Sequence, residues 1–187
     1  WIKMGHRVTV FTSPVGVNIC RANDLMGTRY ITWPAPAFKR LGIFGQYAIG
    51  TFWGFWNVLK CGLGEKDVII WSTSDFWPDS LSGLLMKMFC RKSFWIFSIF
   101  MFAPNPFSKG QKSSWPALLH FITQKPIFCL SKYLAQMIFV TNEQDRQFVI
   151  SQGILPEKVV SIRGGVNLEQ IKNIEPPENK YLACFLG

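Results

Sequence analysis

The residues best suited to chemistry follow an apolar segment at positions 67–72. They are three hydroxyl side chains, one carboxylate and one indole: Ser72, Thr73, Ser74, Asp75 and Trp77. Hydroxyls and carboxylates hydrogen-bond to sugar hydroxyls, an indole stacks on the face of a pyranose, and Asp75 is the best candidate for a general base. An equally simple interpretation is that Ser74 or Asp75 caps the helix expected next. The sequence leaves both open.

Two more polar groups follow apolar segments. Asn142 and Glu143 come after residues 137–141, where they either contact a ligand or cap the helix that begins there. Residues 163–167 pair a cation with two glycines and an amide, and their polar and glycine members are Arg163, Gly164, Gly165 and Asn167. Adjacent glycines allow the backbone to approach an anion or to make a left-handed turn. Here too both interpretations stay open.

Several common chemistries have no support in the sequence. The five cysteines are scattered without a C-x-x-C pair and the two histidines are far apart, so no zinc spacing exists. His6, at a turn before a strand, and His120, in the middle of an apolar helix, are expected to be structural. No G-x-G-x-x-G, P-loop or G-x-S-x-G motif occurs, which removes the usual dehydrogenase, NTPase and hydrolase interpretations. We therefore expect no metal and no cofactor, and the dispersed cysteines favour reduced thiols in a cytosolic setting.

Alternating apolar segments must position these groups. Strands are expected at 7–12, 30–33, 67–72, 93–102, 137–141 and 159–163, with helices at 79–91, 115–133 and 143–152. Uniformly apolar strands between helices indicate a parallel sheet, so the expected fold class is α/β, a doubly wound, Rossmann-like domain. Ligands bind such a sheet at the carboxyl ends of its strands. Five loops meet that rule, at 13–18, 72–78, 103–113, 141–144 and 163–167.

Composition and charge restrict the partner. The chain of 187 residues is 49% apolar and carries a net charge of +9, and the excess of positive charge lies in residues 1–132. This favours phospholipid, nucleic acid or a phosphorylated substrate. Nucleic acid is the weakest of the three, because the cations are dispersed among apolar segments. Residues 41–59 lack charge, and they form either a membrane span, a helix that covers the sheet, or a helix that also dips into a membrane surface.

Six short segments resemble, in order, the motifs of one enzyme family. They read MGHRVTVFT at 4–12, DVII at 67–70, FVTN at 139–142 with QF at 147–148, ILPEKV at 154–159, RGGVN at 163–167 and FLG at 185–187. The corresponding family patterns are GHxVTVFT, DVI, V(T/S)N…F, G(I/V)PxxKV, xGGVD and F(V/L)GR. Their order and spacing match over nearly the whole chain, which therefore resembles family 4 glycosyltransferases with the GT-B fold.

The resemblance implies an acceptor-side domain over residues 1–174, without its first strand, and a linker plus the first strand of a donor-binding domain over 175–187. The whole enzyme would transfer a sugar from a nucleotide-sugar to a glycan or lipid-linked acceptor, with retention, while this stretch alone would be inactive. The acceptor would lie over Ser74, Asp75, Trp77, Met101, Pro104, Asn142 and Glu143, and the donor side over Arg163, Gly164, Gly165 and Asn167.

Two positions depart from the family pattern. Met101 stands about where many relatives place a histidine near the reacting sugar, and Asn167 replaces the usual aspartate. A retaining transferase in which the donor phosphate assists needs no protein nucleophile, so the enzyme interpretation stands. The alternative is a non-catalytic relative that binds carbohydrate or a partner enzyme. Trp53, Phe55 and Trp56 also predict a peripheral site on the anionic cytoplasmic face of a membrane, with Lys39, Arg40 and Lys60 beside them.

Overall fold

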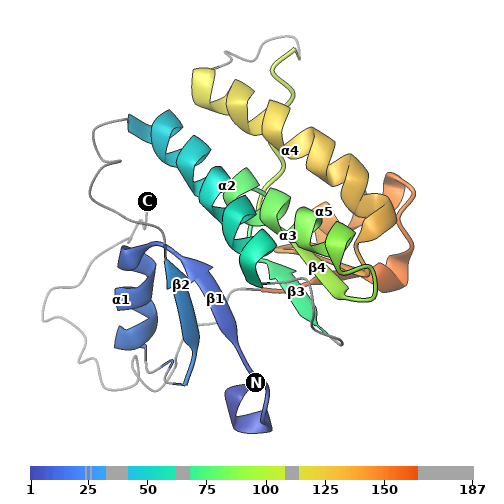
Figure 1. Ribbon diagram of the computed structural model, residues 1–187. Coiled ribbons are helices and arrows are strands. Elements are labelled where there is room, and N and C mark those ends of the chain that lie inside the picture. Colours follow the sequence, from blue (N-terminus) through green and yellow to red (C-terminus); the bar gives the residue numbers. More distant parts are fainter. Residues whose placement is uncertain (24, 26, 33–41, 62–67, 108–113, 164–187) are drawn as a thin grey trace, which may run out of the picture.

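The computed structural model describes residues 1–163 apart from positions 24, 26, 33–41, 62–67 and 108–113. Within these ranges the chain forms parallel strands joined by helices, so the expected α/β class is confirmed (Figure 1). Trp33, Asp67, Gly164, Gly165 and Asn167 lie outside the described residues, as does everything predicted for 164–187.

Six strands form two parallel sheets within the described ranges. β1 (Thr9–Thr12) pairs with β2 (Arg29–Thr32). The second sheet has the order β3-β4-β5-β6, from Ile69–Ser72, Phe94–Ile99, Met137–Val140 and Val159–Ser161. All six strands lie inside or within one residue of the predicted ranges. Because these four strands are parallel, the loops that follow them lie at one edge of the sheet, where open parallel sheets bind ligands.

In the part of the chain that the structure describes, five α-helices connect and cover the strands. They are α1 (Pro14–Ala22), α2 (Gly42–Cys61), α3 (Trp77–Phe89), α4 (Trp115–Leu134) and α5 (Glu143–Ser151), with single 3-10 turns at Ile2–Met4 and Pro156–Lys158. Figure 1 shows α2, α3 and α4 side by side over the four-stranded sheet. Ser114 caps α4 by accepting a hydrogen bond from the Ala117 N–H.

The prediction of a ligand loop at 13–18 is wrong, because residues 14–22 form helix α1. The Ser13 hydroxyl accepts a hydrogen bond from the Gly16 N–H at 3.0 Å, and Pro14 occupies the first helical turn. Serine before proline is a helix start, since the serine caps the free N–H groups and proline lacks an N–H of its own. The same pair also suits the end of the strand predicted at 7–12, which is why the sequence predicts a loop here.

Strand β4 lies at the centre of the core and β3 at its edge. Trp95 and Phe97 are fully buried, whereas Ile69 and Trp71 of β3 are 65% and 42% exposed. The expectation that strands are buried on both faces therefore holds for β4 and is wrong for β3. The core cluster contains Ile70, Leu84, Trp95, Phe97, Ile99, Ile127, Phe128, Ala135, Ile138, Val140, Val149, Ile154 and Val159.

Helix α3 approaches the sheet closely at a glycine. A Cβ atom on Gly83 would lie 2.0 Å from the Ser72 hydroxyl oxygen and 3.0 Å from the Trp95 indole nitrogen. The buried Trp95 indole N–H donates to that same hydroxyl at 3.0 Å. The absence of a side chain at position 83 thus lets α3 lie directly on β3 and β4, immediately before the polar loop that follows β3.

Helix α2 packs along α3 and leaves its other face open. A Cβ on Gly54 would meet the Ser82 hydroxyl and the Pro78 carbonyl, which places this glycine against α3. Phe52 is 63% exposed, and the Lys60 ammonium lies 5.0 Å from the centre of the exposed Trp56 ring. Within the described residues no helix has the length and apolar character needed to cross a bilayer. The contacts of the helix are with α3, in place of the direct cover of the sheet that one interpretation expected.

Candidate functional site

A buried carboxylate lies just beyond the carboxyl end of β3. Asp75 is 2% exposed, and its Oδ2 lies 2.7 Å from both His120 Nε2 and Gln124 Nε2. Both partners come from α4, one helical turn apart, so they point from the same face of that helix. Asp75 is therefore held by two side chains that stand 45 and 49 positions away in the sequence.

Gln124 joins this carboxylate to the loop that follows β4. Its Nε2 also donates to the Met101 carbonyl at 2.8 Å, and its Oε1 accepts from the Ala103 N–H at 2.8 Å. The residue is 5% exposed. Because a buried amide must satisfy its donors and acceptor within the protein, Gln124 fixes two loops and one helix to one another. The ends of β3 and β4 thereby form one site.

His120 is the member of this group that solvent reaches. Its side chain is 16% exposed, and the Phe76 ring stacks on the imidazole with centroids 5.0 Å apart. A carboxylate accepts a hydrogen bond, so Nε2 carries the proton and Nδ1 keeps its lone pair when the imidazole is neutral. This is the arrangement by which an aspartate orients a histidine that takes up a proton at its other nitrogen. The pair can therefore serve as an acid–base group.

The other hydroxyls of the loop bind the first turn of α3. Thr73 and Ser74 donate to Asp79 Oδ2 at 2.9 and 2.8 Å. The N-cap residue is Phe76, without a side-chain cap, so the alternative in which Ser74 or Asp75 caps this helix is wrong. Instead of capping the helix, the Thr73 and Ser74 hydroxyls bind the side chain of Asp79 in its first turn.

Trp77 is directed into the protein. Its indole N–H donates to the Thr123 carbonyl at 2.9 Å, and its backbone N–H donates to the Tyr47 hydroxyl at 3.0 Å. Burial raises the pKa of that Tyr47 hydroxyl. The ring packs against the core cluster. Trp77 of α3 thus connects α2 and α4 through hydrogen bonds next to Asp75. Its stacking on a sugar stays a prediction.

Of the remaining predicted residues, Met101 and Pro104 lie in the loop after β4. The Met101 side chain is 63% exposed while its carbonyl accepts from Gln124, so the backbone of this residue belongs to the Asp75 group. Pro104 is exposed. Through Gln124 the Met101 carbonyl is thus linked to the carboxylate that also binds His120.

Asn142 and Glu143 make hydrogen bonds within helix α5, at whose start they lie. The Asn142 Oδ1 accepts from the Asp145 N–H at 2.8 Å, which confirms the capping interpretation. Glu143 Oε1 accepts from Gln147 at 2.7 Å and from Arg146 at 3.0 Å. These bonds, that of Gln147 first, lower the pKa of Glu143. Arg163 is exposed.

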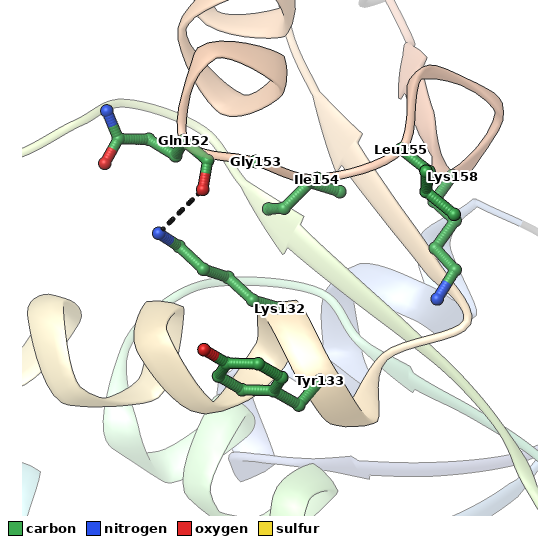
Figure 2. Close-up of a pocket in the computed structure, with 7 residues that line it drawn as sticks. All are labelled: Lys132, Tyr133, Gln152, Gly153, Ile154, Leu155 and Lys158. Atoms are coloured by element: carbon green, nitrogen blue, oxygen red, sulfur yellow. Dashed lines mark hydrogen bonds between the residues drawn. The ribbon is translucent and has the colours of Figure 1, made fainter.

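Two cavities open beside α4. The larger, of about 370 Å³, lies between α4, α5 and the loop after β4. The smaller, of about 260 Å³, lies near the end of α4 and the turn before β6, where Figure 2 shows Lys132, Tyr133 and Lys158 around it. Gln124 lines the larger one, so that cavity reaches the Asp75 group.

Sequence reasoning missed His120 and Gln124. The signal available was their spacing of four within an apolar helix, which puts two polar groups on one face where the core should lie. Within the described residues no three histidine, cysteine or acidic side chains gather closely enough to hold a metal ion. Comparison with known protein families finds no family model that matches this chain, and comparison with curated proteins finds no match either.

Proposed function

We propose that the protein is a glycosyltransferase, in which this chain forms the acceptor-side domain of a GT-B fold. The observation that carries the proposal is the Asp75–His120 pair at the carboxyl ends of β3 and β4, with Oδ2 and Nε2 2.7 Å apart. Substrates of open parallel sheets bind at this edge. The ordered motifs of the sequence supply the reaction class, transfer from a nucleotide-sugar to a glycan or lipid-linked acceptor.

In this proposal His120 receives the proton of the acceptor. The bond between the anomeric carbon and the donor phosphate breaks, and its electron pair leaves with the nucleoside diphosphate. The acceptor hydroxyl oxygen forms the new bond to the anomeric carbon, and its proton passes to Nδ1 of His120. Asp75 touches no substrate, because it is 2% exposed. It is a positioning residue that holds the imidazole in the required tautomer, which revises its predicted role as the base itself.

The test is transfer, measured as nucleoside diphosphate released from a panel of nucleotide-sugars by the protein as its gene encodes it. We expect His120→Ala and Asp75→Asn each to lower kcat by about 100-fold, the low end for general acid–base catalysis, with little change in KM. The matched control is Asp79→Asn, which removes a carboxylate from the same loop and keeps an oxygen for Thr73 and Ser74. It should retain nearly full activity.

Two results would overturn the proposal. One is no turnover of any nucleotide-sugar by the wild-type protein. The other is full activity of a correctly folded His120→Ala variant. Saturable binding of a glycan without turnover would instead support the alternative of a non-catalytic carbohydrate-binding relative. That alternative is consistent with the complete pairing of Asp75 inside the protein.

The exposed face of α2 supports a location at an anionic membrane surface, which we propose for the same protein. Phe52 and Trp56 lie four residues apart and Lys60 four further on, so they share one face of the helix. Aromatic rings enter the interface while lysine meets the headgroups. Co-sedimentation with vesicles of phosphatidylserine should fall when Phe52 and Trp56 are both replaced by serine. Equal sedimentation of this variant would contradict the proposal.

A further inference from the structure

The groove between α4 and α5 is lined by aromatic rings and lysines. Its apolar walls are Phe102, Phe121, Phe128 and Phe148, which come from the loop after β4, from α4 and from α5. Phe102 makes edge-to-face contacts with Phe128 and Phe148 at centroid distances of 5.4 and 4.6 Å. Three segments far apart in sequence thus line an open cavity of about 370 Å³ with carbon.

The charges around this groove have one sign. Lys125 and Lys132 line it, and Lys132 and Lys158 line the adjoining smaller cavity (Figure 2). Among the described residues that line the two cavities, none is acidic. Each of the first two ammonium groups lies over a groove ring, Lys125 5.3 Å from the Phe121 centroid and Lys132 5.1 Å from the Phe128 centroid. An apolar trough with a cationic rim is complementary to an amphipathic anion.

One end of the groove reaches the candidate site. Gln124 lines it and donates to Asp75, and Lys125 is the next residue. Toward the other end the Lys132 ammonium donates to the Gln152 carbonyl at 3.1 Å and so joins α4 to the end of α5. A chain in the groove would therefore extend away from the Asp75–His120 pair. Of the two lysines of α4, Lys125 is the nearer to that pair along the helix.

We infer that this groove binds the hydrocarbon chain of a lipid phosphate that carries the acceptor glycan, with the phosphate at Lys125. The inference rests on the proposed function, because it identifies the class of acceptor. A single aliphatic chain fits between phenylalanine rings, the phosphate meets an ammonium group, and a sugar attached to it lies on the His120 side. A small inorganic anion would make no apolar contact with the phenylalanine rings, so the rings favour a ligand with a hydrocarbon chain.

The test measures binding by calorimetry with the full protein, so it does not depend on transfer. Dodecyl phosphate, below its micelle concentration, should bind saturably, and dodecyl maltoside with the same chain should bind about tenfold more weakly. We expect Lys125→Glu and Phe148→Ser each to weaken dodecyl phosphate binding about tenfold. Lys125 is exposed and Phe148 is 45% exposed, so both variants should fold. Circular dichroism checks this.

The matched controls lie at the end of α3 and in the turn that follows it. Lys92→Glu reverses an exposed lysine, and Phe89→Ser removes a ring that is 50% exposed, and both should bind like wild type. Equal losses in the controls, no saturable binding, or equally tight binding of inorganic phosphate would each overturn the inference. Binding without any turnover of nucleotide-sugars would leave this inference standing and refute the proposed enzyme activity.

Discussion

The loops after β3 and after β5 look alike in the sequence and differ in the folded protein. Each follows an apolar parallel strand and combines a hydroxyl with a carboxylate. Asp75, after β3, is 2% exposed and is bound by residues 45 and 49 positions away. Glu143, after β5, is exposed and is bound by residues three and four positions away. The carboxylate of the first loop is therefore bound through tertiary structure, and that of the second by its own helix.

The difference follows from burial. A polar group removed from water needs a partner inside the protein, and leaving it without one costs more than the net value of an ordinary hydrogen bond. The loop after β3 lies beneath α4, so α4 supplies those partners, and one of them, His120, has a side chain that is 16% exposed. The loop after β5 is more exposed: its Thr141 hydroxyl donates to the Phe100 carbonyl at 3.1 Å, while Asn142 and Glu143 bind their own helix. The candidate acid–base pair is thus formed because the loop after β3 is buried and needs partners from α4.

The largest expected effect comes from Asp75→Ala. It removes the acceptor of His120 and of one Gln124 hydrogen bond within a buried region. Each buried donor left unpaired costs about 1–3 kcal/mol, so we expect a loss of about 3 kcal/mol in the free energy of unfolding. Urea denaturation measures it. A loss of unfolding free energy smaller than that of the helix-cap variant Asn142→Ala would show that water replaces the carboxylate. The contrast between the two loops would then be wrong.

A smaller effect is expected from Gly83→Ala, which disturbs the base of the same loop. The new methyl carbon would lie 2.0 Å from the Ser72 hydroxyl and 3.0 Å from the Trp95 indole nitrogen. Overpacking of this kind costs about 1–3 kcal/mol, although alanine favours a helix more than glycine does. Thermal denaturation monitored by circular dichroism is the measurement. A variant more stable than wild type would mean that α3 can move away from the sheet freely.

The loop after β5 should respond less, through Asn142→Ala. Only the cap of α5 is lost, because Asn142 Oδ1 accepts from the Asp145 N–H and no bond to another element is involved. Removal of such a cap costs about 1 kcal/mol. Urea denaturation should show this value, and the Asp75→Ala variant measured beside it provides the contrast. A loss as large as that of Asp75→Ala would reveal a tertiary role that the structure does not contain.

Features that depend on local sequence were predicted well. Strands β3 to β6 and helices α3 to α5 follow from apolar runs, helix caps and glycine stops, and the Asn142 cap was one of two stated alternatives. Helix α1 was missed because Ser13 and Pro14 suit both a strand end and a helix start. Only the following residues distinguish the two, and their apolar spacing is weak. The exposure of β3 was missed because hydropathy does not report which strand lies at an edge.

Features that depend on long-range contacts could not be predicted in the same way. Asp75 was selected for its chemistry, but its two partners lie in a helix whose composition is apolar. His120 was expected to be structural because its neighbours in the sequence are apolar, and those neighbours do not determine what faces it. Knowing that α4 crosses the end of β3 is the missing step. The spacing of His120 and Gln124 indicates that both lie on one face of the helix, but it does not indicate that Asp75 is their partner.

The smallest effect on stability is expected from Glu143→Gln. Its dependence on pH tests whether the carboxylate of the loop after β5 interacts only with its own helix. Hydrogen bonds from Gln147 and Arg146 lower the folded-state pKa of Glu143 below its ordinary value of 4.5. Its contribution to stability is therefore present above that value and is lost as the pH falls through the lower, folded-state pKa. The carboxylate is exposed, so solvent screens the effect. Urea midpoints at neutral pH should fall slightly for the variant and should converge with wild type in acid. Midpoints that stay apart in acid would show that the side chain acts through packing or a distant partner, and the two loops would then be more alike than the structure indicates.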